Sequence, residues 1–242
     1  MAPKMFFTTL DIIAIAWFII TAFSYSWFTE HGPLKDKTLS AHMNERRESW
    51  LRVTLDRDLR IVDTSIVTGL QNGTAFFASA SLLGIGACFA MLRSSNEIYS
   101  LLEELPFSSS NSQAEWQFKV FCLLIVFAYA FFKFGWSHRL WNYTSILVGA
   151  LPLAEHKNKD KEKTEEALQS ALAMNRLAGR HFNRGLRTFF FSIGIIGWFV
   201  GPIVFMIATT WIIIVLIRRQ FFSASMRAAQ IKTMSDLKKS AK

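Results

Sequence analysis

Polar side chains inside otherwise apolar segments are the residues of this sequence that could do chemistry. The first group lies in DTSIVTGLQNGTAFFASAS, residues 63–81. On a helix, Thr68, Gln71 and Asn72 share one broad face, and Gly69 and Gly73 form a small-xxx-small pair beside it. Such a face either joins helices through hydrogen bonds and close backbone approach or lines a hydrated path for an ion or small solute.

A second group lies in KFGWSHRLWNYTS, where Lys133, Arg139 and Asn142 interrupt an apolar stretch. Cations at membrane depth are costly unless they reach an interface, water or a carboxylate. One interpretation is anchoring, in which the long side chains extend to the membrane surface. The other is a specific ion pair between Asp63 and either Arg139 or Lys133.

A third group precedes and enters the last apolar stretch. Arg184 and Arg187 are candidate contacts for lipid headgroups, because phosphate groups attract arginine. A small-residue face follows, which favours close helix packing and is formed by Gly194, Gly197 and Gly201.

Signatures of common enzymes are absent from the sequence. It contains no HExxH, no phosphate-binding glycine loop, no GxSxG and no paired cysteine motif, and its five histidines are scattered. We therefore expect no catalytic residues, no metal and no cofactor. The net charge of +9 suits loops that meet anionic lipid better than nucleic acid, for which no motif is present.

Long uncharged runs set the architecture that must position these groups. They predict an all-α polytopic membrane protein with about four transmembrane helices near residues 5–28, 63–92, 116–140 and 188–217. These spans form a single membrane domain, 1–222, followed by a basic tail, 223–242. The first span is too long for a cleaved signal peptide. The third either continues past Arg139 into the cytoplasm or breaks near Gly135, and the fourth either kinks at Gly201-Pro202 or turns back there.

Positive charge predicts the orientation. Seven Lys and Arg residues lie in 29–62, eight in 155–187, seven in 218–242 and only one in 93–115. The first two segments are expected on the cytoplasmic side of a bacterial inner membrane. Four simple spans would put the basic tail on the opposite side, against the rule. A hairpin at Gly201-Pro202 would remove that conflict.

Two of the basic segments also have helical apolar patterns. Leucines recur every four residues in 39–60, at Leu51, Leu55 and Leu59. In 160–180 an apolar stripe contains Leu168, Ala171 and Leu172. Amphipathic helices of this kind either lie on the membrane surface or pack together as a cytoplasmic cap.

Three stretches carry a resemblance to a known family. They are RIVDTSIVTGLQNGTAFFASASLLGIGA, FKFGWSHRLWNYTSILVGALP and NRGLRTFFFSIGIIGWFVGP, and the likeness extends from about Asp11 to Phe222. The chain resembles the bacterial and plant membrane family called domain of unknown function 599. The matching positions are Leu70, Gln71 and Asn72; Ser137, Arg139 and Asn142; Gly185, Arg187, Trp198, Gly201 and Pro202. Gln71 stands where other members often carry a basic residue. The resemblance implies a four-span membrane fold and no particular activity.

We expect a non-enzymatic accessory or scaffolding subunit of a membrane assembly. Its expected partners are anionic lipids and either another protein or further copies of this chain. The alternative is a homo-oligomeric ion channel or small-solute transporter, whose polar path is lined by the second span. A membrane enzyme acting on lipid is a third possibility.

Overall fold

In the computed structural model the described residues are 7–95, 97 and 112–230, and every regular element among them is helical. The helices are α1 (Thr9–Glu30), η1 (Lys35–Lys37), α2 (Leu39–Thr54), α3 (Ile61–Arg93), α5 (Gln113–Gly149), α6 (Lys161–Trp198), α7 (Pro202–Phe221) and α8 (Ala224–Gln230). Four segments are long and apolar enough to cross a membrane, namely α1, α3, α5 and α7 with its continuation into α8. The predicted all-α membrane class is confirmed.

Short polar side chains define where the helices begin. Thr8 caps α1 and forms a reciprocal capping box with Asp11, while Thr38 caps α2 and Ser112 caps α5. Asp160 caps α6 by accepting a hydrogen bond from the Lys163 amide. Each of these oxygens satisfies a backbone amide that has no partner within its own helix.

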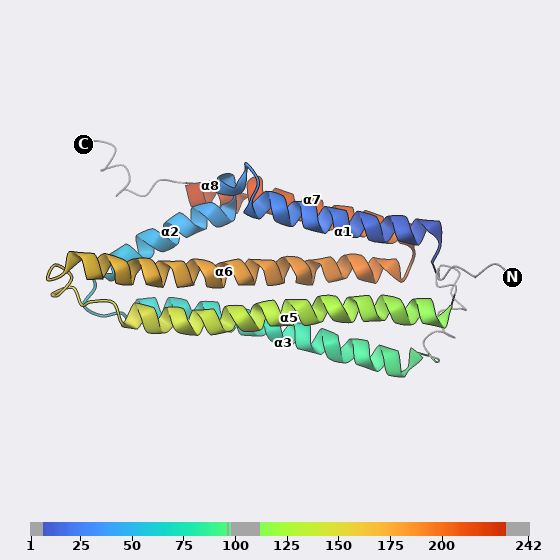
Figure 1. Ribbon diagram of the computed structural model, residues 1–242, viewed down its shortest axis with the longest axis horizontal. Helices are drawn as coiled ribbons and strands as arrows, with labels where there is room; N and C mark the ends of the chain where they lie inside the picture. The colour runs from blue at the N-terminus through green and yellow to red at the C-terminus, as the bar shows by residue number, and fades with distance from the viewer. Residues whose placement is uncertain (1–6, 96, 98–111, 231–242) are drawn as a thin grey trace.

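The long helix α6 lies between two helix pairs, α1 with α7 and α3 with α5 (Figure 1). After Trp198 the chain reverses over 199–201, and α7 returns along α6. Proline has no amide hydrogen and suits the first position of a helix, so Pro202 starts a new helix and does not continue the old one. The prediction of one span over 188–217 is therefore wrong, and the hairpin alternative describes the chain.

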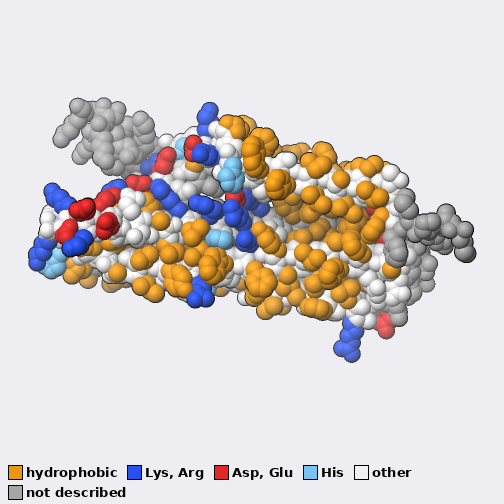
Figure 2. Space-filling model, in the orientation of Figure 1, with side chains coloured by type: hydrophobic (Ala, Val, Ile, Leu, Met, Phe, Trp, Pro, Cys, Tyr) orange, Lys and Arg blue, Asp and Glu red, His pale blue; other side chains and the backbone are white. Residues whose placement is uncertain are grey.

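This reversal brings the basic segments to one end of the molecule. The segment 31–60, the start of α6, the end of α7 and α8 all lie opposite the beginning of α1 (Figure 1). Charged side chains gather in that half of the surface, whereas hydrophobic ones cover the other half (Figure 2). The described part of the basic tail, 223–230, thus lies with the two basic loops. Residues 231–242 and 5–6 lie outside the described chain, as does most of loop 93–115.

Helix α5 is continuous over its 37 residues, so the predicted break near Gly135 is absent. At 1.5 Å per residue it is about 55 Å long, well beyond a hydrocarbon core of about 30 Å. Its far end packs against α2 and the first half of α6. Leu51, Leu168, Leu172 and Val148 are all buried in this cluster. The two amphipathic helices therefore pack together as a cap, although Leu59 lies beyond the end of α2 and is 74% exposed.

The opposite end of the bundle is held by aromatic packing around buried charges. Trp198 stacks on Phe205 with ring centroids 5.2 Å apart, and its Nε1 donates to Asp11 Oδ1 at 2.8 Å. Lys119 Nζ lies 2.8 Å from Glu115 Oε1, and both side chains are fully buried. Trp198 thus joins α6 to α1 and α7, and Lys119 Nζ, 5.4 Å from the centre of the Trp198 ring, brings α5 to the same place.

Candidate functional site

A cavity of about 500 Å³ lies at the level where α1 ends. Its walls come from the end of α1, from η1 and the start of α2, from the middle of α6 and from the end of α7. Seven of its lining residues are cationic: Lys35, Arg47, Arg176, Arg180, Arg184, Arg187 and Arg219. Only two are carboxylates, Glu30 and Asp36. We call this space the basic cavity.

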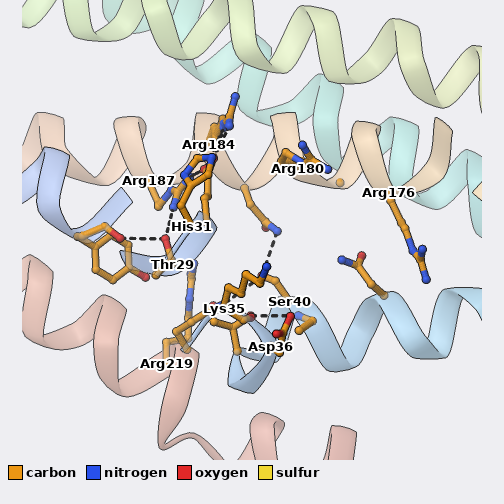
Figure 3. Close-up of a pocket in the computed structure, with 18 of the residues that line it drawn as sticks. Thr29, His31, Lys35, Asp36, Ser40, Arg176, Arg180, Arg184, Arg187 and Arg219 are labelled. Carbon is orange, nitrogen blue, oxygen red and sulfur yellow. Dashed lines mark hydrogen bonds and ion pairs between the residues drawn. The ribbon is translucent and has the colours of Figure 1, made fainter. Parts of the chain in front are cut away.

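Helix α6 supplies the row of arginines. Arg176, Arg180, Arg184 and Arg187 follow one another at spacings of four, four and three, which places them on one face of a helix. Figure 3 shows them along α6, with Lys35, Asp36 and Ser40 from η1 and α2 across the cavity and Arg219 from α7 nearby. Since cations outnumber carboxylates in this lining, the cavity attracts anions.

Glycine at position 179 lets α2 approach this face. A Cβ at Gly179 would lie 2.7 Å from Nη1 of Arg47, too close for any real contact. Arg47 donates to Asn44 Oδ1 at 2.7 Å, and its guanidinium lies 5.9 Å from the centre of the Trp141 ring. Burial and the neighbouring Arg176 charge both lower the pKa of Arg47. An anion in the cavity would relieve this repulsion between like charges.

Two of the arginines are held by one carboxylate. Arg184 Nε donates to Glu30 at 2.9 and 3.1 Å, and a terminal nitrogen of each arginine also pairs with Glu30. Arg187 Nη1 further donates to Thr29 Oγ1 at 2.7 Å. The Glu30 side chain is only 17% exposed. The Glu30 carboxylate thus sits between Arg184 and Arg187, in the position that a bound anion could otherwise take.

Other cations of the cavity have no such carboxylate. Within the described residues, no ion pair joins Lys35, Arg47, Arg180 or Arg219 to an acidic side chain. Arg219 instead lies 5.5 Å from the centre of the Phe190 ring. Since grouped cations repel one another, the arrangement suits a ligand with several negative charges.

A second hollow of about 370 Å³ adjoins the basic cavity between α1, α5 and α6. The two share Glu30, His31, Arg184 and Arg187 at their boundary. The remaining walls of the second hollow are mainly apolar: Ala22, Phe23, Ser26, Trp27, Tyr129, Thr188 and Phe191. Phe23 and Trp27 are 73% and 48% exposed, so this hollow opens on the outer surface of the bundle. We call it the apolar groove.

The structure brings Arg184 and Arg187 into this site, but it places Asp63 elsewhere. Asp63 is fully buried and accepts hydrogen bonds from Trp50 Nε1 at 2.6 Å, Thr54 Oγ1 at 2.9 Å and Arg57 Nη1 at 2.6 Å. The predicted pairing of Asp63 with Arg139 or Lys133 is therefore wrong.

Those two cations stay on their own helix. Arg139 Nε donates to Tyr143 Oη at 2.6 Å, and Lys133 Nζ lies 4.9 Å from the Tyr129 ring centre. They do not pair with Asp63 because that carboxylate already pairs with Arg57, only six residues before it in the chain.

The predicted polar face of the second span points outwards. Thr68 and Asn72 are exposed, and the Thr68 hydroxyl donates to the Thr64 carbonyl of its own helix. Gln71 Nε2 donates to Asn142 Oδ1 at 2.7 Å, so these two residues join α3 to α5. Within one chain, this face borders neither the basic cavity nor the apolar groove.

The predicted packing glycines divide into two groups. A Cβ at Gly194 would lie 2.9 Å from Thr209 Oγ1, and one at Gly197 would lie 3.3 Å from Ala208, so both allow α7 to approach α6 closely. Gly201 is the buried N-cap residue of α7. By contrast, a Cβ built at Gly69 or Gly73 would meet no described atom within 4 Å beyond its chain neighbours and the nearby backbone of α3.

Sequence reasoning missed several cavity residues, namely Glu30, Lys35, Arg47, Arg176, Arg180 and Arg219. The helical spacing of the four arginines on α6 was a readable signal. The partners on α1, α2 and α7 were not, because they meet α6 only through the fold.

Comparison with known proteins gives a family. The model of the family described as "Protein of unknown function, DUF599" matches residues 13–225. No curated protein matches the chain, and no solved structure matches it either.

Proposed function

The chain belongs to the DUF599 family, and we propose that it is a non-enzymatic membrane protein that binds a phosphate-bearing anion in its basic cavity. The observation that carries this proposal is the composition of the cavity, in which seven Lys and Arg residues face two carboxylates around about 500 Å³. Ligand pockets commonly have volumes of this order. Arginine suits phosphate because its planar fork donates two parallel hydrogen bonds.

The position of the cavity supports the same proposal. It lies at the end of α1 and α7, where the apolar surface gives way to the charged one (Figure 2). The concentration of Lys and Arg at this end favours a cytoplasmic location under the positive-inside rule. A bacterial inner membrane, predicted from the sequence, fits this orientation.

An accessory role in a membrane assembly fits an anion-binding protein of this kind. The exposed side of α3 around Gly69 and Gly73 offers a surface on which another helix could approach closely. A channel lined by Thr68, Gln71 and Asn72 has less support. Gln71 is already bonded to Asn142, so such a path needs several copies around an axis.

The test is direct binding of pyrophosphate to the purified protein in a mild non-ionic detergent, measured by calorimetry. We compare the wild type with the double variant Arg180→Gln/Arg219→Gln, which removes two cavity cations that have no carboxylate partner in the described chain. Each charge-assisted hydrogen bond is worth about 1.5–3 kcal/mol, so at least a tenfold loss of affinity is expected. The matched control is Arg139→Gln, an exposed arginine outside the cavity. Equal affinities of the double variant and the wild type would contradict the proposal.

A further inference from the structure

The basic cavity and the apolar groove adjoin each other. They share Glu30, His31, Arg184 and Arg187, so a ligand that spans this boundary has its charged part in the cavity and its apolar part in the groove. We propose that the ligand is an anionic phospholipid, which enters sideways from the membrane between α1 and α5. This inference rests on the proposed function, because it identifies the class of anion that the cavity binds.

The wall of the groove has the chemistry of a binding site for an acyl chain. Phe23 and Phe191 line it below the level of Glu30, one or two helical turns deeper in the apolar belt. Trp27 and Tyr129 lie nearer the boundary, where amphipathic aromatic side chains prefer the level of the headgroups. A soluble anion without an acyl chain would make no contact with these apolar side chains.

The charges of the cavity indicate the kind of headgroup. Glu30 already balances part of the charge of Arg184 and Arg187, whereas Lys35, Arg47, Arg180 and Arg219 have no acidic partner within the described chain. A zwitterionic headgroup would bring a further cation into this set. A headgroup with a terminal phosphate carries up to two negative charges and three strong acceptor oxygens, and it complements the set best.

The apolar groove opens on the outer surface of the bundle, so a lipid can reach it from the side. The exposed faces of Phe23, Trp27 and Tyr129 border the groove on the lipid-facing surface of the bundle. The phosphate then meets Arg184 and Arg187 first and can pass from them to Arg180 and Arg219. Because these cations line the cavity beyond the shared boundary, the headgroup moves towards the cavity while the acyl chain stays in the groove.

The test compares the same headgroup with and without acyl chains. The protein is placed in phosphatidylcholine nanodiscs with dioleoylphosphatidic acid added at low mole fraction, and bound lipid is counted by native mass spectrometry. Glycerol 3-phosphate, which carries the same phosphate without chains, is titrated against the protein in nanodiscs of phosphatidylcholine alone. Dioleoylphosphatidylglycerol, with a single negative charge, is the comparison for headgroup charge.

Two groove variants separate the halves of the site. Ser26→Phe fills the groove, and Phe23→Ala removes an exposed part of its wall. The Ser26 carbonyl accepts a hydrogen bond from Thr29 Oγ1 at 3.2 Å, and the substitution keeps that carbonyl. The matched control is Ile20→Phe, at a position on α1 that is 60% exposed and outside the groove.

We expect phosphatidic acid to bind at least tenfold more tightly than phosphatidylglycerol. Both groove variants should lose about tenfold for phosphatidic acid and keep the wild-type affinity for glycerol 3-phosphate. Ile20→Phe should change neither. If glycerol 3-phosphate binds as tightly as the lipid and the groove variants bind both normally, the phospholipid inference falls and anion binding stands. If neither compound binds, and Arg180→Gln/Arg219→Gln changes nothing, both proposals fall.

Discussion

Replacing Glu30 by Gln should destabilise the empty protein and strengthen its binding of anions. Glu30 accepts hydrogen bonds from Arg184 and Arg187, and its side chain is 17% exposed. Glutamine keeps the shape but loses the charge and one acceptor oxygen. Two arginines are then left close together without their carboxylate, next to the other cations of the cavity.

The size of the destabilisation follows from these contacts. Hydrogen bonds to charged groups contribute about 1.5–3 kcal/mol, and breaking a fully buried pair costs about 3–5 kcal/mol. Arg184 is 32% exposed and Arg187 11%, so solvent screens part of the effect. We expect a loss of about 2–3 kcal/mol in the free energy of unfolding. For a chain of this length, each kcal/mol lowers the Tm by about 2–4 °C.

An anionic ligand should reverse this loss. Without Glu30, an incoming phosphate no longer competes with a carboxylate for Arg184 and Arg187. A tenfold gain in affinity adds about 1.4 kcal/mol of stabilisation at saturating ligand. The variant should therefore have a lower Tm than the wild type without phosphatidic acid, and a larger rise in Tm with it.

The assay is thermal unfolding in detergent, followed by tryptophan fluorescence, with and without phosphatidic acid. The control is Glu165→Gln, which removes a 49% exposed carboxylate paired with Arg52 far from the cavity. Such surface pairs contribute about 0–1 kcal/mol, so the ligand-induced rise in Tm should stay at its wild-type value. The reasoning is refuted if Glu30→Gln weakens anion binding or leaves both stability and binding unchanged.

Three further predictions concern the rest of the fold. Asp63→Asn should cost about 2–4 kcal/mol in chemical unfolding, because the carboxylate receives buried hydrogen bonds from Trp50 and Thr54 and pairs with Arg57; a change near zero would show that this cluster is not held by charge. Gly194→Ala should destabilise the α6–α7 hairpin, because its Cβ would lie 2.9 Å from Thr209 Oγ1. Gly73→Ala should instead gain about 0.5–1 kcal/mol in the free energy of unfolding from helix propensity. Thermal unfolding should therefore show a lower Tm for the first variant and a higher Tm for the second, and changes of the same sign would contradict the packing. Lys119→Met should lower the free energy of unfolding by about 3–5 kcal/mol, because it removes the cation of a fully buried pair, and Glu115→Gln/Lys119→Met should lower it by less. If a double-mutant cycle shows that the effects of the two single substitutions simply add, Glu115 and Lys119 are not coupled.

The sequence was sufficient for the helical class and for most spans. Long uncharged runs predicted α1 and α3 closely and the start of α5, which continues past the predicted end at 140 to Gly149, because the bilayer requires about 20 consecutive apolar residues per crossing. The fourth predicted span, 188–217, merged the end of α6 with α7, because both are apolar and only the turn at 199–201 separates them. The arginines of α6 precede this stretch and line the basic cavity, where two of them pair with Glu30. Hydropathy averages over a helix and does not register which side a charge faces.

Other choices were left to tertiary contacts. The sequence offered Gly201-Pro202 as either a kink or a turn, and the fit of Gly194 and Gly197 against α7 decided for the turn. It named Arg184 and Arg187 but gave no account of their neighbours. Glu30 lies more than 150 residues before them, and no sequence pattern links the two.

Composition and spacing therefore determined the helical class and most of the long apolar segments, that basic charge borders them, and which glycines could permit close packing. The tertiary structure decided what each polar side chain meets. Asp63 accepts a hydrogen bond from Arg57 and not from Arg139, and Gln71 donates one to Asn142. Cations from four segments line one cavity. The physical reason is that apolar burial is additive along a helix and readable locally, whereas an ion pair or a cavity depends on the relative placement of several helices.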